Sequence, residues 1–120
     1  MKYMIMMFGD AAPMLEQKSP EWIRGMIAFM QKIGEDLTAS GELAGGEGLV
    51  DSTQAKKIHV VDGISIATDG PFAEAKESLI GYWIVDVESE ARAIEIGKEI
   101  VDFTKEPLEI RRVADGPPEI

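Results

Sequence analysis

The sequence predicts an α+β domain, and three observations lead to this fold class. Two segments show the helical spacing of apolar residues, whereas several others show the short apolar runs typical of strands. Along the chain these elements follow the order strand, helix, several strands, helix and strand, which is typical of a sheet with helices packed against it. The length of 120 residues and the apolar content of 45% suffice for one domain with one hydrophobic core.

The chain begins with a predicted strand and a loop. Residues 3–8 form a continuous apolar run that ends at Gly9, as expected for a buried strand. Residues 9–19 follow and include Pro13, so we expect a loop there.

A long amphipathic helix is predicted over residues 20–39. Ser19 suits the N-cap position, Pro20 is preorganised for the first turn, and Gly41 follows the end of the helix. Apolar side chains recur at helical spacing and predict one buried face, formed by Trp22, Ile23, Met26, Ile27, Met30, Ile33 and Leu37.

The middle of the chain predicts a distorted strand and a hairpin. Residues 43–50 are rich in glycine, which suits a distorted strand or a bulge. Residues 58–61 and 64–66 flank Asp62-Gly63, a preferred two-residue turn because both positions tolerate positive φ.

The single histidine lies on the first strand of this hairpin. Its neighbours Ile58 and Val60 are expected to face inward, so His59 would share the outer face with Lys57 and Val61. We therefore expect His59 to be exposed to solvent.

The last third of the chain predicts a strand, a helix and a second strand. Residues 79–87 form a long strand candidate, and residues 108–113 form a short one. Between them, Ser89 suits the N-cap of a helix that runs to about Thr104. Residues 114–120 are expected to form a loose tail.

The predicted domain, residues 1–113, best fits a split β-α-β arrangement, the ferredoxin-like plait, with the hairpin as an addition. Two helices cover only one face of such a sheet, yet the strands at 3–8 and 79–87 are apolar on both faces. In the longer strand, one face is expected to carry Leu79, Gly81, Trp83, Val85 and Val87, and the other Ile80, Tyr82, Ile84 and Asp86. Packing of two such sheets in a homodimer would bury the second face, and the alternative is that residues 9–19 cover it.

Composition and charge exclude several classes of function. The net charge of −10 disfavours nucleic acids and anionic membrane surfaces as partners. The chain has no cysteine and one histidine, which excludes a thiolate nucleophile, a cysteine metal site and a multi-histidine metal cage. We expect no metal and no cofactor. The glycine-rich stretch is not a phosphate loop, because it lacks the Gly-Lys-Ser/Thr end and a following helix. The absence of signal-peptide and membrane-span patterns predicts a cytoplasmic protein.

The segment Ala67-Thr68-Asp69-Gly70-Pro71-Phe72-Ala73-Glu74-Ala75-Lys76-Glu77 resembles the signature of the YCII-related proteins. More narrowly it resembles their DGPF branch, which is named after Asp-Gly-Pro-Phe. The resemblance extends over residues 1–113 and includes Met1-Lys2-Tyr3-Met4, the glycine-rich stretch, Gly81-Tyr82-Trp83 and Leu108-Glu109-Ile110-Arg111.

This resemblance implies a ferredoxin-like dimeric α/β barrel, in agreement with the homodimer inferred from the apolar faces. It also implies a small-molecule pocket between the sheet and the helices. The YCII branch is similar to enzymes with a histidine–aspartate pair whose histidine lies in the first helix. Residues 20–39 contain no histidine, so the resemblance does not carry that chemistry over to this chain.

Residues 69–77 supply the candidate catalytic groups. Asp69 follows a strand and lies near Phe72, so it is suited to act as a desolvated general base. The alternative is that Asp69 fixes the turn through hydrogen bonds to backbone amides. Glu77 is the second candidate base.

Four further residues are candidates for ligand binding. Phe72 either stacks on a ligand or anchors the loop in the core. Glu74 and Lys76 either form a solvated surface or face inward, where Lys76 would hold an acid ionised and attract an anionic substrate. Tyr82 either lines the pocket or packs in the core.

The sequence therefore predicts a cytoplasmic homodimer that performs metal-free acid–base chemistry on a small metabolite, with Asp69 or Glu77 as the base. The alternative is a non-catalytic small-molecule-binding or regulatory homodimeric module, in which the 69–77 loop is scaffold or lid. A third interpretation is a structural dimer whose charged loop keeps it in solution.

Overall fold

The computed structural model describes residues 1–9, 17–70 and 78–118. In chain order its elements are β1 (Lys2–Gly9), α2 (Pro20–Ala39), β2 (Leu43–Gly48), a short 3₁₀ helix η1 (Ser52–Gln54), β3 (Lys56–Val61), β4 (Ile64–Asp69), β5 (Ser78–Asp86), α3 (Glu90–Thr104) and β6 (Leu108–Arg112). Each strand and helix predicted from the sequence is present at its expected place, within three residues at either end.

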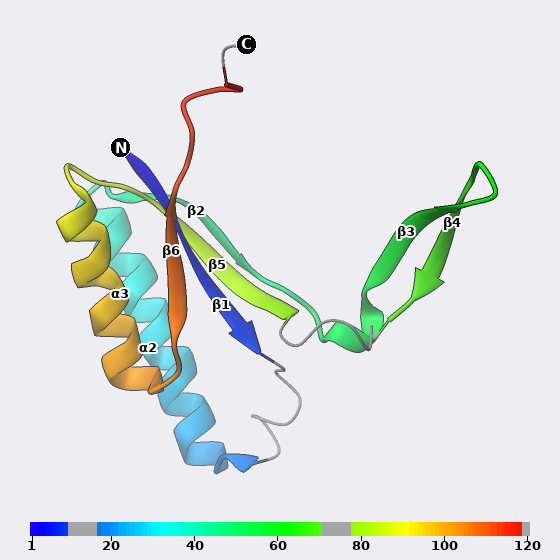
Figure 1. The fold of residues 1–120 in the computed structure, drawn as a ribbon. Helices are drawn as coiled ribbons and strands as arrows, with labels where there is room; N and C mark the ends of the chain where they lie inside the picture. Colours follow the sequence, from blue (N-terminus) through cyan, green and yellow to red (C-terminus); the bar gives the residue numbers. More distant parts are fainter. Residues whose placement is uncertain (10–16, 71–77, 119–120) are drawn as a thin grey trace.

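Four strands form one antiparallel sheet in the order β2-β5-β1-β6. The helices α2 and α3 make the two connections that skip a strand position, so the α+β class and the ferredoxin-like plait are confirmed. The extra hairpin, β3 paired with β4, is inserted between β2 and β5 and stands apart from the sheet (Figure 1). Among the described residues the sheet is open and forms no closed barrel.

Both helices begin where their capping residues predict. The hydroxyl of Ser19 accepts a hydrogen bond from the backbone N–H of Trp22 at 3.1 Å, and the hydroxyl of Ser89 accepts one from Arg92 at 3.2 Å. The helix α3 ends at Lys105, which adopts a left-handed conformation with φ 61°.

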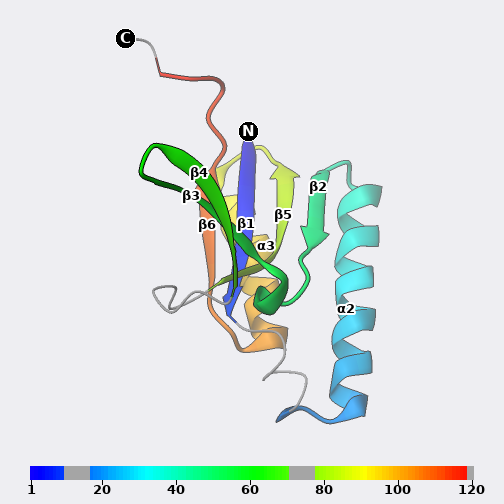
Figure 2. The ribbon, with the colours of Figure 1, turned by 90° about the vertical axis from the view of Figure 1, so that its right-hand side faces the viewer.

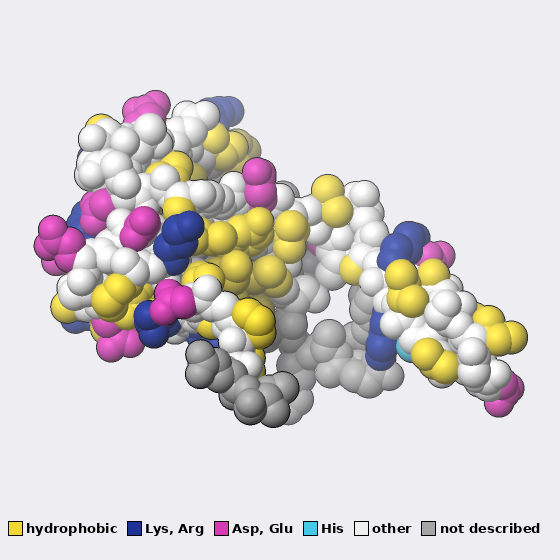
Figure 3. Space-filling model, turned by 90° about the horizontal axis from the view of Figure 1, so that it is seen from above, with side chains coloured by type: hydrophobic (Ala, Val, Ile, Leu, Met, Phe, Trp, Pro, Cys, Tyr) yellow, Lys and Arg dark blue, Asp and Glu magenta, His cyan; other side chains and the backbone are white. Residues whose placement is uncertain are grey.

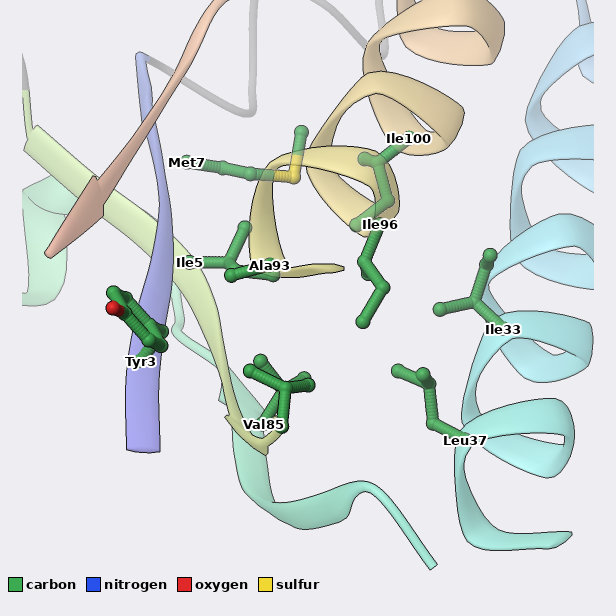
Figure 4. Packing of buried hydrophobic residues seen from close by; sticks show 10 residues of the cluster. Tyr3, Ile5, Met7, Ile33, Leu37, Val85, Ala93, Ile96 and Ile100 are labelled. Carbon is green, nitrogen blue, oxygen red and sulfur yellow. The ribbon is translucent and has the colours of Figure 1, made fainter. Parts of the chain in front are cut away.

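The hydrophobic core lies on one face of the sheet. Alternate residues of β1 and β5 meet the inner sides of both helices, as the close view in Figure 4 shows. The buried cluster consists of Tyr3, Ile5, Met7, Ile33, Leu37, Val85, Val87, Ala93, Ile96 and Ile100. Because this core lies between the sheet and both helices, the helices leave the opposite face of the sheet uncovered. We call this opposite face the open face.

The helix α2 buries less of its apolar face than its pattern predicts. Of the seven apolar positions only Ile33 and Leu37 are buried, and Ile27 is 50% exposed. The reason is that α2 lies beside the edge strand β2, whereas α3 lies directly behind the sheet (Figure 2). The first half of α2 packs instead on α3, where the ring of Phe29 stacks on Phe103 with centroids 4.3 Å apart.

A β-bulge changes the expected alternation at the start of β5. Met7 pairs with Gly81 and Phe8 pairs with Leu79, so Ile80 is an extra residue in the ladder. The expectation that Ile80 lies on the face opposite Trp83 is therefore wrong, because both side chains pack against the buried core.

Beyond this bulge the alternation holds. Val85 is buried in the core, so its neighbour Ile84 points to the open face. Met4 pairs with Ile84, and Met6 pairs with Tyr82. The open face is therefore as apolar as the sequence predicts.

The hairpin has the predicted turn but not the predicted faces. Asp62 and Gly63 adopt φ values of 52° and 79°, as the two-residue turn requires. The expectation for His59 is wrong, since Ile58 and Val60 are 73% and 70% exposed whereas His59 is half-buried. Because the hairpin does not pack on the four-stranded sheet, neither of its two faces is turned toward the core.

Two further expectations concern the ends of segments. Pro13 and most of the predicted 9–19 loop lie outside the described residues. In the tail, residues 114–118 contain no helix or strand.

No helix within the described ranges has the length and apolar character needed to cross a membrane.

Candidate functional site

An open cleft of about 570 Å³ lies between α2 and the strands β2 and β5. Its lining residues come from β1, α2, β2 and β5, namely Met7, Met26, Met30, Gly34, Leu43, Gly46, Glu47, Gly48, Ile80, Gly81, Tyr82 and Trp83. The cleft exists because the first half of α2 stands away from the sheet, and the volume is in the range typical of small-molecule sites.

Glycines give this cleft much of its space. A Cβ atom added at Gly34 of α2 would meet no atom within 4 Å, so the helix presents a gap there. On the facing strand, a Cβ at Gly46 would lie 2.8 Å from the backbone oxygen of Tyr82. The glycine at 46 is therefore needed for the close pairing of β2 with β5, and this pairing leaves the strand bare of side chains beside the cleft.

The chemistry of the lining is mainly apolar. Three methionines and Trp83 contribute thioether and indole surfaces, and methionine side chains adapt readily to irregular shapes. Glu47 is the one carboxylate among the described lining residues. Within the described ranges, no group of three or more metal-ligating side chains is found. Such a lining suits an apolar or aromatic small molecule with few polar atoms.

The structure places Tyr82 at the cleft but not Asp69. Tyr82 is among the lining residues, although the alternation of β5 directs its ring toward the open face, and its role in ligand binding stays a prediction. Asp69 ends β4 and lies opposite Lys56 in the hairpin ladder, where its carboxylate forms an exposed ion pair with the Lys56 ammonium. The backbone N–H of Gly70 also donates to the carbonyl of Ala55 at 2.7 Å. Asp69 therefore belongs to the base of the hairpin.

The other four predicted site residues, Phe72, Glu74, Lys76 and Glu77, lie outside the described residues. Their roles in ligand binding and catalysis stay predictions.

One strongly perturbed ion pair joins the start of β2 to the start of α3. The Nε and Nη2 groups of Arg92 donate to the two carboxylate oxygens of Glu42 at 2.8 and 2.9 Å. Together with the hydroxyl of Ser40, which donates at 2.8 Å, Arg92 lowers the pKa of Glu42 from 4.5 to about 2. A carboxylate held ionised in this way is a poor general base near neutral pH, so the pair has a structural role.

Apart from Tyr82, sequence patterns do not reveal the residues that form the cleft. The spacing of Met26 and Met30 predicts a buried helix face, and Gly34 carries no pattern of its own. The glycine-rich stretch around Gly46 was the one available signal, because a strand without side chains indicates close approach or open space.

Comparison with known proteins agrees with the resemblance seen in the sequence. The sequence model of the YCII-related domain matches residues 1–115. An uncharacterized protein of Rhizobium meliloti (strain 1021) is 27% identical over 103 residues, which cover 83% of this chain and 80% of that protein.

Proposed function

The chain belongs to the YCII-related domain family, and we propose that it is a homodimer that binds a small, mostly apolar molecule in the cleft between α2 and the sheet. The observation that carries the proposal is the cleft itself. It is about 570 Å³ in volume, and its lining is dominated by methionine, leucine, isoleucine and tryptophan side chains. Binding of an apolar ligand to this lining is favourable, because it removes apolar surface from water.

Binding has more support than acid–base chemistry. Among the described residues, the cleft offers Glu47 as its single carboxylate and no paired acid and base. Asp69, the first candidate base, is exposed and paired with Lys56. The contribution of Glu77 lies outside the described residues, so catalysis by that residue stays a prediction.

The homodimer is supported by the open face of the sheet. Met4 and Met6 of β1 lie next to Ile84 and Tyr82 of β5 on this face, and both helices lie on the other side of the sheet (Figure 1). A second copy would bury these side chains, as expected for two sheets packed face to face. The family resemblance favours the same arrangement, a barrel made by two chains.

Ligand binding is tested with Nile red, a neutral apolar dye whose fluorescence rises in apolar sites. We expect the wild-type protein to bind the dye, and Gly34→Leu, which places a side chain in the cleft, to raise the Kd about tenfold or more. The matched control is Ala28→Leu, which adds the same side chain to an exposed position of α2. Absence of dye binding, or equal binding by all three proteins, would overturn the cleft as the site.

Native mass spectrometry of the purified protein tests the rest of the proposal. We expect the mass of a dimer, and a retained small molecule would identify the class of ligand directly. A monomer at micromolar concentration would overturn the homodimer. The dye titration would then still test whether the cleft binds a ligand.

A further inference from the structure

The β3–β4 hairpin, residues 56–69, forms an arm with apolar side chains on both of its faces. Ile58 and Val60 lie on one face and are more than two-thirds exposed. The other face carries Val61, Ile64 and Ile66, which are also exposed. Hydrophobic side chains gather on this arm and again in the middle of the molecule, as Figure 3 shows. A two-stranded ribbon is marginally stable alone, and one with two bare apolar faces needs another surface to cover it.

The chain exposes more surface than one compact domain does. Its accessible surface is 8610 Å², whereas a compact monomer of 13.1 kDa is expected to expose about 6,400 Å². Its radius of gyration is 16.9 Å, compared with about 14 Å for a compact domain of this length. The excess of about 2,200 Å² exceeds the roughly 800 Å² that each partner contributes to a stable dimer. The chain therefore has the surface to form a dimer interface.

Charge indicates which partner fits the arm. Lys56 and Lys57 balance Asp62 and Asp69, so residues 56–69 carry no net charge and the rest of the chain carries the whole net charge of −10. Two identical acidic chains repel each other over most of their surfaces, and their contact is favoured where both surfaces are neutral. The arm is one such surface.

The position of the arm agrees with this partner. In two perpendicular views the arm stands on the side of the sheet opposite α3, in front of the open face (Figures 1 and 2). A second copy seated on the open face would thus come within reach of the arm.

We propose that the β3–β4 arm is a clasp that packs against a second copy of this chain and buries its apolar side chains in the dimer. The proposal rests on the proposed homodimer and adds a second contact to the one made by the open face. Twofold symmetry makes the contact reciprocal, so each arm contributes to the interface.

The first test compares dimer dissociation constants by sedimentation equilibrium. Ile58→Lys combined with Val60→Lys places two charges on the arm, and we expect it to raise the dimer Kd about 100-fold or more. The matched control combines Ile27→Lys with Ile94→Lys, which adds the same charges to exposed isoleucines of α2 and α3. The control should stay within about threefold of wild type.

The second test measures burial of the arm directly. The natural chain has no cysteine, so Ser65→Cys reports on the arm alone, and Ala91→Cys on α3 serves as the exposed control. We expect maleimide to label Ser65→Cys about tenfold more slowly above the dimer Kd than below it, and Ala91→Cys to react equally at both concentrations.

The outcomes separate the arm from the dimer. A wild-type dimer whose arm is labelled rapidly, and whose lysine variants match the control, overturns the clasp and leaves the homodimer intact. A wild-type chain that is monomeric at every concentration overturns both. Slow labelling of Ser65→Cys in the monomer means that the arm folds onto its own chain, which also overturns the clasp.

Discussion

Gly46 lies directly opposite Trp83 in the β2–β5 ladder, so close that a Cβ atom at Gly46 would be 3.2 Å from the Cα atom of Trp83 and 2.8 Å from the carbonyl oxygen of Tyr82. Backbone atoms of a paired strand cannot yield as the end of a side chain can. The close approach of the two backbones at Gly46 holds the edge strand β2 beside the cleft. It therefore affects both the stability of the fold and the shape of the cleft.

Gly46→Ala should therefore lower the free energy of unfolding by about 1–3 kcal/mol, because β2 must move away from β5 to accept the methyl group. Gly48→Ala on the same strand is the control, since its added Cβ meets nothing within 4 Å, and it should change stability by less than about 0.5 kcal/mol. Urea denaturation measures both. Equal effects of the two variants would contradict the close approach at Gly46.

Gly34→Ala should stabilise the protein. The position lies inside α2, where alanine is preferred over glycine by about 0.5–1 kcal/mol, and the new methyl group enters empty space in the cleft. Gly25→Ala in the same helix is the comparison, because its Cβ would make an ordinary contact of 3.9 Å with Phe103. Thermal denaturation should show a gain for both variants, and a loss for Gly34→Ala alone would mean that the cleft is filled at that point.

The ion pair of Glu42 with Arg92 predicts a specific dependence on pH. The folded state lowers the pKa of Glu42 from 4.5 to about 2, so its contribution to stability is complete above about pH 4.5 and is lost as the pH falls toward 2. Glu42→Gln should lower the free energy of unfolding by about 1–2 kcal/mol at pH 7, since the pair is partly solvated, and the difference from wild type should vanish near pH 2.

Glu95→Gln is the control for this pair. Glu95 also accepts a hydrogen bond from Arg92, at 2.7 Å, but its side chain is far more exposed than that of Glu42. We expect a change below about 0.5 kcal/mol at every pH. If the two variants behave alike in denaturation curves at pH 7 and pH 2.5, the Glu42 pair has no special role.

Asp69→Asn tests whether this carboxylate has a role beyond the hairpin. The ion pair with Lys56 is exposed, so its loss should cost less than about 1 kcal/mol in free energy of unfolding. Lys56→Gln breaks the same pair from the other side and should cost about as much. Nile red binding should be unchanged in both variants, because neither residue lines the cleft. A loss of binding limited to Asp69→Asn would bring Asp69 back as a site residue.

Local signals in the sequence predicted most of the fold. Ser19 and Ser89 mark the beginnings of the helices, and Asp62-Gly63 marks the hairpin turn, because capping and turn geometry depend on a few consecutive residues. The apolar character of both faces of β1 and β5 is also visible in the sequence, and it predicts the homodimer that we propose.

Tertiary structure decided where these elements stand relative to one another. The bulge at Ile80, the cleft lined by Met26 and Met30, and the separation of the hairpin from the sheet all depend on packing between residues far apart in the chain. A strand pattern cannot reveal an extra residue opposite a partner, and a helical pattern cannot reveal that its apolar face lines a cleft.

The sequence by itself determined the elements, their order, the family and the apolar surplus of the chain. Only the tertiary structure decided that the cleft lies at Gly34 and Gly46, that Asp69 belongs to the arm, and that the arm stands apart from the four-stranded sheet. The physical reason is that secondary structure follows from short-range backbone and side-chain preferences, whereas a binding site is made by the spacing between elements, which long-range packing sets.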